Sequence, residues 1–344
     1  MNRIIAKALV ILIPLYIICI FSGFLAPYHF NNQFRDQSFH GPMFLKIHIF
    51  DYNNKLRKPF VYASKRLTTE TGRFEYLEDK NKIYPIAFFA SGDEYTLLGL
   101  FKCKRHLFLV HKSVRLFLLG SDGFGRDIFS RLLYGIQISI LISLIGTLIT
   151  VILSLIIGMI SGYYGKKLDF LIMRLIEVLM SIPAFYLLLS LRNLFPIHLS
   201  STYIYLILII LLSFISWAGF SRVIRNMVKS LKTSEYIIAA KVIGLKDSKI
   251  IIKHILPNLL GFIIVNSVLI IPFYIIGEIT LSFLGIGIAE PVASLGTMLK
   301  EAQNIRNITD FPWVLSPGFA IFIIVYGYNL LGEGLRKRFN PKEN

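Results

Sequence analysis

Six long apolar runs constrain this chain more than any other feature of its sequence. A hydrocarbon layer of about 30 Å requires roughly 20 apolar residues in a helix to cross it. The runs are 4–26, 136–160, 168–191, 203–220, 259–286 and 313–331. The sequence is 55% hydrophobic with a mean hydropathy of +0.63, which is high for a soluble protein. We therefore expect an all-α polytopic membrane protein with six transmembrane helices.

The first run is expected to remain as an uncleaved helix. It is longer than the core of a secretory signal peptide, and no small-x-small cleavage pattern follows it. Cys19 is preceded by Ile18 rather than by a small residue, which argues against a lipoprotein site.

Lysine and arginine are distributed unevenly between the loops that join these runs. Basic residues in short loops stay on the cytoplasmic side of a membrane. If the amino terminus is inside, the cytoplasmic segments carry sixteen of them and the short outer loops carry three. We therefore expect a multi-pass protein with both termini in the cytoplasm.

The formal net charge of +17 does not indicate nucleic-acid binding. Much of the excess lies in the loops that fix the topology, and no nucleic-acid-binding motif accompanies it. Basic residues at the ends of the spans instead suit contact with anionic lipid headgroups in the membrane. The two cysteines provide no disulfide framework.

Residues 27–119 form the one large interruption between apolar runs. This segment follows the first helix and lies outside, because long segments cross a membrane regardless of their charge. Aromatic and β-branched runs on either side of Ser91-Gly92-Asp93 predict a hairpin that turns there. Five histidines in this segment have no metal-ligand spacing. We expect an N-terminal transmembrane helix (1–26), a small, partly β extracytoplasmic insertion (27–119) and a transmembrane domain of five helices (120–344).

The second apolar run carries small residues at every fourth position. In lipid, helices associate through close backbone approach and interhelical hydrogen bonds, so we expect this helix at the centre of a bundle. The residues could serve tight packing alone or line a moving gate. One row is Gly146, Thr150, Ser154, Gly158 and Gly162, and the other is Gly135, Ser139, Ser143 and Thr147.

Three charged residues lie well inside the apolar runs, away from their first few residues: Arg174, Glu177 and Glu278. A charge at the centre of a span costs on the order of 2.5–3.5 kcal/mol on insertion scales, so none is expected to face lipid alone. Arg174 and Glu177 are three residues apart on one helix face and are expected to pair. Glu278 lies about 30 Å along its helix from Pro257, towards the outer surface. A proton relay would require further intramembrane acids or histidines.

Several sequence motifs of enzymes are absent. The sequence contains no G-x-x-x-x-G-K-[ST] phosphate-binding loop, no H-E-x-x-H, no G-x-S-x-G and no Cys/His metal pattern. We expect a chain that is not an enzyme, has no catalytic residues and binds no cofactor or metal of its own.

A polar stretch separates the fourth and fifth apolar runs on the cytoplasmic side: EYIIAAKVIGLKDSKIIIKHILPN, residues 235–258. Its first half favours helix, and Gly244 is placed to end that helix in a left-handed conformation. Asp247 is placed to cap a second helix, and Pro257 stands where the next helix begins. On the residues alone, this element is either a rigid knob for a partner protein or an amphipathic hairpin on lipid headgroups.

This stretch resembles the cytoplasmic EAA loop of ABC importer permeases, which reads E-A-A, three residues, G, nine residues, I-x-L-P. Ile238 and His254 stand in place of the glutamate and the isoleucine, so any salt bridge of that glutamate is lost. The resemblance implies that residues 234–258 form a loop that couples to ATPase subunits. Its coupling residues would be Ala239, Ala240, Gly244, Leu245, Leu256 and Pro257, of which all but Leu245 match the pattern.

Further segments resemble the oligopeptide/dipeptide permease family, specifically its C-type subunit. GSDGFGRDIFSRLLYGIQISI (120–140) is similar to the segment that enters the second span in that family. LIMRLIEVLMSIP, GEITLSFLGIGI, SLGTMLKEAQNI and YNLLGEGLRKRFNP also resemble it, in the same order, and the likeness extends from about Ile83 to the C-terminus. The structural or gating candidates are Gly125, Arg126, Asp127, Arg174, Glu177, Gly158, Gly162 and Glu278.

The resemblance implies a bacterial inner-membrane permease with a type I-like fold that forms half of a translocation pathway for oligopeptides or dipeptides. A second homologous permease subunit would supply the other half, and two ATP-binding-cassette ATPase subunits would bind ATP and magnesium. An extracytoplasmic substrate-binding protein would deliver the peptide. In such a transporter the ATP is bound by other subunits, which agrees with the absence of a phosphate-binding loop from this sequence.

Other functions stay open at this stage. Relatives that import nickel chelates or glutathione belong to the same family, and no residue excludes those substrates. A proton-driven carrier or a membrane-embedded enzyme would need clustered intramembrane acids and histidines, whereas the charges here are scattered. A structural anchor for the insertion would leave the glycine loop and the small-residue rows unexplained.

Overall fold

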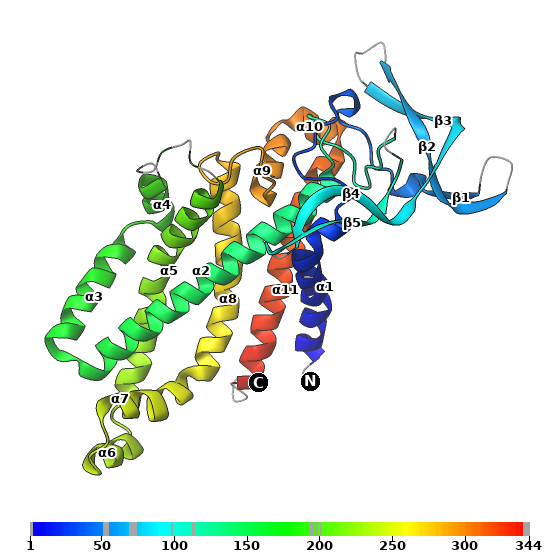
Figure 1. Ribbon diagram of the computed structural model, residues 1–344. Helices are drawn as coiled ribbons and strands as arrows, with labels where there is room; N and C mark the ends of the chain where they lie inside the picture. The colour runs from blue at the N-terminus through cyan, green and yellow to red at the C-terminus, as the bar shows by residue number, and fades with distance from the viewer. Residues whose placement is uncertain are drawn as a thin grey trace. The chain divides into compact units, whose positions relative to one another are not determined.

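The computed structural model describes residues 3–50, 55–68, 74–97, 99–111, 114–192, 194, 196, 199 and 201–339 (Figure 1). The outermost bounds of the predicted domains, residues 1 and 344, lie outside these ranges. The chain divides into two compact units. Unit 1 comprises residues 1–11, 141–278 and 325–344, and unit 2 comprises residues 12–140 and 279–324.

Five of the described helices are long and apolar enough to cross a membrane. They correspond to the first, second, fourth, fifth and sixth predicted spans, so the helical membrane fold is confirmed. The helices of the second and fourth predicted spans continue with polar residues well beyond their apolar runs. The five helices are α1 (Arg3–Leu25), α2 (Ile128–Tyr164), α5 (Ser201–Leu231), α8 (Leu256–Phe283) and α11 (Ser316–Phe339).

The third predicted span, residues 168–191, differs from the expectation of one helix. It consists of α3 (Lys166–Ser181) and α4 (Ala184–Arg192), which are separated at Ile182 and Pro183. The ring of a proline disfavours helical backbone in the residue before it, and Ile182 is extended with φ −91° and ψ 125°. The 16 residues of α3 span about 24 Å, less than the hydrocarbon layer. The prediction of a single helix over residues 168–191 is therefore wrong.

All strands of the described chain lie in the predicted insertion, which confirms its partly β character. One antiparallel sheet has the order β1-β2-β3, and a separate antiparallel pair is β4-β5. Val61, Ile86 and Phe117 lie in the buried core of this region. The strands are β1 (His48–Phe50), β2 (Leu56–Thr68), β3 (Phe74–Pro85), β4 (Ala87–Leu97) and β5 (Phe101–Leu109).

The predicted hairpin turn at Ser91-Gly92-Asp93 is wrong, because these residues lie inside β4. The chain reverses between Leu97 and Phe101 instead, where Gly99 has a φ of +71°. A Cβ atom at Gly92 would lie 2.7 Å from the ring of His106 and 2.8 Å from Leu109. Gly92 therefore provides space for packing within a strand pair rather than a turn.

Short helices join the long ones within each unit. In unit 1, α6 (Glu235–Val242), α7 (Asp247–Ile250) and a π-helical turn (Ile251–Ile255) connect α5 to α8 (Figure 1). In unit 2, the insertion contains the 3-10 turns η1 (Arg35–Gln37) and η2 (Phe44–Lys46). The segment between α8 and α11 contains α9 (Leu295–Leu299), η4 (Lys300–Gln303), α10 (Ile305–Asp310) and η5 (Pro312–Leu315).

Candidate functional site

The α6–α7 element, residues 234–258, is built around a glycine cap. Gly244 has a φ of +82°, which confirms the predicted left-handed conformation. Its N–H donates to the carbonyl of Lys241 at 2.9 Å, and the N–H of Leu245 donates to the carbonyl of Ala240 at 3.2 Å. This pair of hydrogen bonds is a Schellman motif, which satisfies the last carbonyls of α6 and turns the chain sharply into α7.

One face of this element is anchored in the core of unit 1. Ile237, Ala240, Ile250 and Ile255 are buried in a cluster with Leu259 of α8 and with side chains of α2 and α5. Each fully buried aliphatic side chain stabilises the folded state by about 1.5–3 kcal/mol. The α6–α7 element is therefore a rigid part of unit 1.

The opposite face of the element is apolar and exposed. Val242 is 82% exposed, Ile243 79% and Ile238 51%, and Ala239 beside them is also exposed. Ala239 and Ala240 thus have different roles, since only Ala240 is buried. An exposed set of aliphatic side chains on a rigid support is typical of a protein interaction site.

Tyr163, near the end of α2, connects three parts of unit 1. Its side chain is 2% exposed, and its hydroxyl donates a 2.5 Å hydrogen bond to Oδ1 of Asp247 at the start of α7. Its carbonyl accepts a hydrogen bond from Nζ of Lys232, which follows α5. The ammonium group of Lys241 on α6 lies 4.9 Å from the centre of its ring. One buried residue of α2 thus contacts both short helices.

The predicted roles of Asp247 and Pro257 differ from the observed ones. Lys246 is the N-cap residue of α7, and Asp247 is its first helical residue, with its side chain turned to Tyr163 rather than to the helix end. The helical path continues from Asp247 through the π-helical turn into α8. Pro257 is therefore the second residue of α8 and does not begin a new helix. The N–H of Leu256 donates to the carbonyl of Ile251, which continues the helical hydrogen bonding from the π-helical turn into α8. Leu245 and Leu256, both half-buried, pack against the same core.

The first row of small residues on α2 lies against neighbouring helices of unit 1. Cβ atoms at Gly158 and Gly162 would lie 2.8 Å and 2.6 Å from backbone carbonyl oxygens of α5. Ser154 donates to the carbonyl of Trp217 at 3.0 Å, and the hydroxyls of Thr150 and Tyr274 on α8 are 2.6 Å apart. The row therefore permits close backbone contact with α5 and hydrogen bonds to α5 and α8.

The three charged residues of the apolar runs each have an interaction partner. Arg174 and Glu177 form the predicted pair on α3, with a 2.7 Å ion pair. Glu278 on α8 is fully buried and interacts electrostatically with Tyr205 of α5. Asp169 of α3 and Arg225 of α5 form a further ion pair, which the sequence did not single out.

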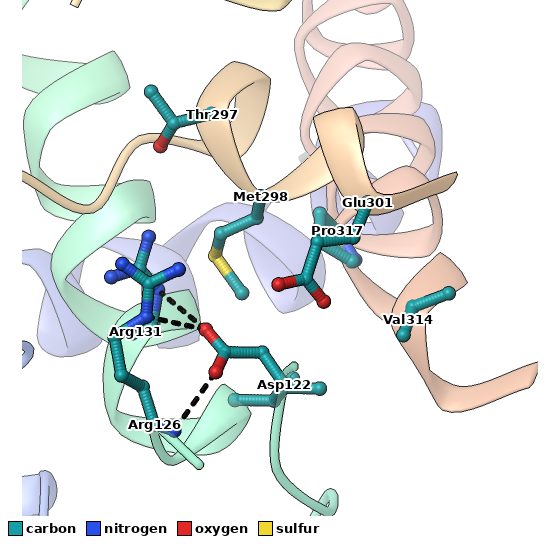
Figure 2. A pocket seen from close by; sticks show the side chains of 9 residues that line it. Asp122, Arg126, Arg131, Thr297, Met298, Glu301, Val314 and Pro317 are labelled. Atoms are coloured by element: carbon teal, nitrogen blue, oxygen red, sulfur yellow. Dashed lines mark hydrogen bonds and ion pairs between the residues drawn. The ribbon is translucent and has the colours of Figure 1, made fainter. Parts of the chain in front are cut away.

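Unit 2 contains a buried cluster of charges at the start of α2 (Figure 2). Nε of Arg126 donates to Asp122 at 2.5 Å, and its guanidinium group also binds Glu290. Arg131 lies 3.0 Å from Glu290 and 3.8 Å from Asp122. Both arginine side chains are at most 4% exposed. Burying a guanidinium charge is strongly unfavourable unless carboxylates pair with it, as Asp122 and Glu290 do here.

The two other predicted residues of this segment, Gly125 and Asp127, hold the turn before α2. Gly125 has a φ of +73°, and a Cβ atom there would lie 1.9 Å from the carbonyl oxygen of Phe34. Asp127 accepts hydrogen bonds from the N–H and hydroxyl of Ser130 at 2.8 and 2.6 Å, while its Oδ1 is buried with no partner in the described chain. Burial raises the pKa of Asp127 to about 7, against the lowering effect of Ser130.

Glu301 of η4 faces the same cluster (Figure 2). Burial and the nearby Asp122 carboxylate raise the pKa of Glu301 to about 7, although the N–H of Gly123, 3.3 Å away, and the two arginines favour its charged form. The cavity between these groups has a volume of about 10 Å³, the size of one water molecule. This cluster is therefore a structural joint between α2 and the α9–η4 segment and not a substrate pocket.

Sequence reasoning missed Tyr163, Arg131, Glu290 and Glu301. Their partners are far away in the sequence, and none forms a local pattern with its neighbours. Arg131 offered a signal, because an arginine one turn inside an apolar helix requires a counter-charge. Among the described residues, no group of three metal-ligating side chains comes together.

Comparison with known proteins places the chain in a family. The sequence model of the binding-protein-dependent transport system inner membrane component matches residues 154–344. The dipeptide transport system permease protein DppC of Alkalihalophilus pseudofirmus is 36% identical over 224 residues, which are 65% of this chain and 71% of the relative. The oligopeptide transport system permease protein OppC of Escherichia coli (strain K12) is 37% identical over 225 residues, 65% of this chain and 72% of the relative.

A solved structure titled as inward-facing conformations of the MetNI methionine ABC transporter covers 59% of this chain and 94% of the matched chain, with 19% identity and a TM-score of 0.44. The assignment rests on the family match, which covers more than half of this chain, and on the relatives at 36–37% identity. The chain belongs to the family of inner membrane components of binding-protein-dependent transport systems and is a permease subunit of an ABC importer.

Proposed function

We propose that this permease imports oligopeptides or dipeptides and that its α6–α7 element couples it to separate ATPase subunits. The element supports this proposal because it presents Ile238, Val242 and Ile243 on a base that is fixed in the helical core. A lipid-bound hairpin would not need that rigid base. The observation that carries the proposal is therefore the exposed apolar face on a Schellman-capped, buried support.

The departure from the EAA pattern suits an apolar contact. Ile238 replaces the glutamate of the pattern, and its exposed side chain extends the surface made by Val242 and Ile243. The matching groove of the ATPase would then be lined by apolar side chains rather than by a basic partner.

The family of this chain supports the remaining components of the proposal. A second homologous permease subunit completes the pathway, and two ATP-binding-cassette subunits bind ATP and magnesium in the cytoplasm. A substrate-binding protein on the outer side delivers the peptide. The chain itself has no catalytic residue and no cofactor, both termini lie in the cytoplasm, and residues 27–119 lie outside. Alternating access then requires contacts that differ between inward- and outward-facing states.

A groove in unit 1 is a candidate for this chain's half of the pathway. It has a volume of about 410 Å³ and lies where α3 and α4 separate at Pro183. Ser216 of α5 and Phe273 of α8 line its other walls. The groove is open on one side, as half of a pathway shared by two subunits would be. A Ser216→Trp substitution is expected to abolish uptake while the complex still assembles and hydrolyses ATP.

The substrate rests on the printed functions of the relatives and is tested by uptake. Proteoliposomes would contain this chain, the partner permease and both ATPases, with the binding protein added outside. We expect ATP-dependent uptake of a labelled peptide that unlabelled peptide inhibits and that glutathione or a nickel chelate does not. Uptake of those ligands instead would favour the alternatives within the family. Peptide uptake driven by a proton gradient without ATP would favour a carrier.

A further inference from the structure

Both ends of the β4–β5 hairpin expose apolar side chains. At the start of β4, Phe88 and Phe89 are 57% and 62% exposed, and at the turn, Leu100 and Phe101 are 77% and 63% exposed. Large apolar side chains exposed in this way mark contact with another molecule or with a membrane. Residues 27–119 lie outside the segment that the family model matches, so the family does not explain this surface.

The hairpin packs against a membrane-spanning helix. Tyr95 and Leu97 of β4 form one wall of a groove of about 330 Å³, and Ile17, Phe21, Phe24 and Leu25 of α1 form the other. The contact is close, because a Cβ atom at Gly23 would lie 2.4 Å from the ring of Tyr95. The rings of Phe24 and Phe89 are 6.0 Å apart.

The position of this groove along α1 sets its depth. Ile17 precedes Leu25, the last residue of α1, by eight residues and therefore lies about 12 Å deeper along the helix. α1 has 23 residues, a few more than the roughly 20 that cross the hydrocarbon layer, so its last residues lie near the membrane surface. Ile17 and Phe21 consequently lie at the depth of the acyl chains. The groove begins beside β4 at the membrane surface and opens downwards along α1.

The backbone of the hairpin limits how deep it can lie. Two strands leave N–H and C=O groups unpaired at their outer edges, and such groups are not tolerated in hydrocarbon. The strands therefore belong in the hydrated headgroup layer, from which the side chains of Leu100 and Phe101 can extend downwards. Lys104 and Arg105 follow on β5 and are both exposed, and Lys104 also forms an exposed 3.4 Å ion pair with Glu94. Basic side chains next to an apolar tip suit contact with an anionic phospholipid, whose phosphate lies above its acyl chains.

We propose that the β4–β5 hairpin lies in the headgroup layer of the leaflet on the side of the insertion and that its groove against α1 binds an acyl chain of an anionic phospholipid. The hairpin then fixes the insertion at the membrane surface. This site is independent of the transported substrate and of the ATPase contact. The continuity of the groove with the lipid-facing surface of α1 favours lipid over a protein partner as the occupant.

Spin-label accessibility tests the position of the tip. The full chain carrying Leu100→Cys and Cys103→Ser would be labelled with a nitroxide in nanodiscs; Cys19 is buried. We expect the label to collide with oxygen and to be shielded from a water-soluble nickel chelate. A label at Leu77→Cys on β3, which is 54% exposed, is the matched control and should show the reverse. Equal exposure of both labels to the nickel chelate would overturn the proposal.

The same label distinguishes lipid from a protein occupant. In the complete transporter, a lipid contact leaves the oxygen accessibility of the Leu100 label unchanged. If the label is accessible to water in the isolated chain and shielded from both agents only in the complex, a partner subunit covers the tip and the proposal is wrong.

The headgroup contact is tested with lipid charge. Immersion of the Leu100 label is expected to be deeper in nanodiscs that contain phosphatidylglycerol than in phosphatidylcholine alone. The double variant Lys104→Glu with Arg105→Glu should abolish this difference, whereas Lys65→Glu on β2 should preserve it. Immersion that does not depend on lipid charge in the unsubstituted hairpin would contradict the anionic headgroup.

Discussion

The hydroxyl of Tyr163 donates a 2.5 Å hydrogen bond to Asp247, and this contact joins α2 to the first turn of α7. Tyr163 directly follows the small-residue row of α2, whose Gly158 and Gly162 lie against the backbone of α5. A displacement of the α6–α7 element therefore acts on a helix that packs closely against α5. Under the proposed function, this is the route by which ATPase closure moves the transmembrane helices.

The first prediction concerns the Tyr163 hydroxyl. Tyr163→Phe keeps the buried ring and removes only the donor to Asp247, at a cost of about 1–2 kcal/mol in stability. We expect the complete transporter to hydrolyse ATP while importing less substrate per ATP. The measurement is the ratio of uptake to hydrolysis in proteoliposomes. Tyr164→Phe, at a neighbouring side chain that is 48% exposed, is the control, and a ratio equal to that control would refute the mechanical link.

The second prediction concerns the conformation of Gly244. No heavy atom lies within 4 Å of a Cβ atom built there, so a substitution acts through the backbone and not through a clash. A left-handed conformation costs a β-branched residue roughly 1–2 kcal/mol, whereas asparagine tolerates it. Gly244→Val should abolish uptake at an unchanged protein level in the membrane, and Gly244→Asn should retain most of it. Normal uptake by the valine variant would show that the cap is not required.

The third prediction compares two glycines in unit 1. Gly162→Ala places a Cβ atom 2.6 Å from the carbonyl oxygen of Arg225, so α2 and α5 must separate, at a cost of about 1–3 kcal/mol. At Gly219 the nearest atom is 4.0 Å away, and alanine there should stabilise the helix by up to about 1 kcal/mol. Thermal unfolding in detergent should therefore shift in opposite directions for the two variants. A Gly162→Ala variant as stable as the wild type would show that the helices are not held at this distance.

Local patterns allowed correct predictions of several features. The glycine cap at Gly244 and the Arg174–Glu177 pair depend on residues within one or two helical turns, and both are observed. Five spans follow from apolar runs alone. The third span was predicted as one helix because its run is long enough, although Pro183 within it breaks the helix.

Long-range contacts could not be predicted in the same way. Tyr163 and Asp247 are 84 residues apart, and Arg126 and Glu290 are 164 residues apart. Neither pair has a periodic signal, since each forms only when segments far apart in the sequence pack together. The hairpin turn was misplaced because a contact between two strands, which the sequence does not show, decides the role of Gly92. Ser91-Gly92-Asp93 has the composition of a turn, but Gly92 is needed for its contact with His106 on the opposite strand.

The fourth prediction concerns pH and Glu301. Its pKa in the folded state is about 7 against an ordinary 4.5, so between these values the folded state keeps a proton that the unfolded state has released. Stability therefore falls as pH rises through this window. Glu301→Gln should be more stable than the wild type at pH 8, by on the order of 2 kcal/mol, and similar to it at pH 4.5.

The pH prediction is measured by thermal unfolding of the two proteins in detergent from pH 4.5 to 8. Asp127 still titrates in the variant, so a smaller pH dependence should persist. Glu94→Gln, at an exposed carboxylate of β4, should follow the wild-type curve. A Glu301→Gln curve parallel to the wild-type curve would contradict a protonated, buried Glu301.

Site-specific crosslinking from Ile243 tests the central claim most directly. Ile243→Cys would be introduced into the assembled transporter in cells, together with Leu45→Cys, an equally exposed residue of the insertion, as the control. The account predicts that a short bifunctional reagent joins Ile243→Cys to an ATPase subunit and that Leu45→Cys yields no such product. An Ile243→Cys transporter that imports substrate normally yet never crosslinks to an ATPase subunit would contradict it.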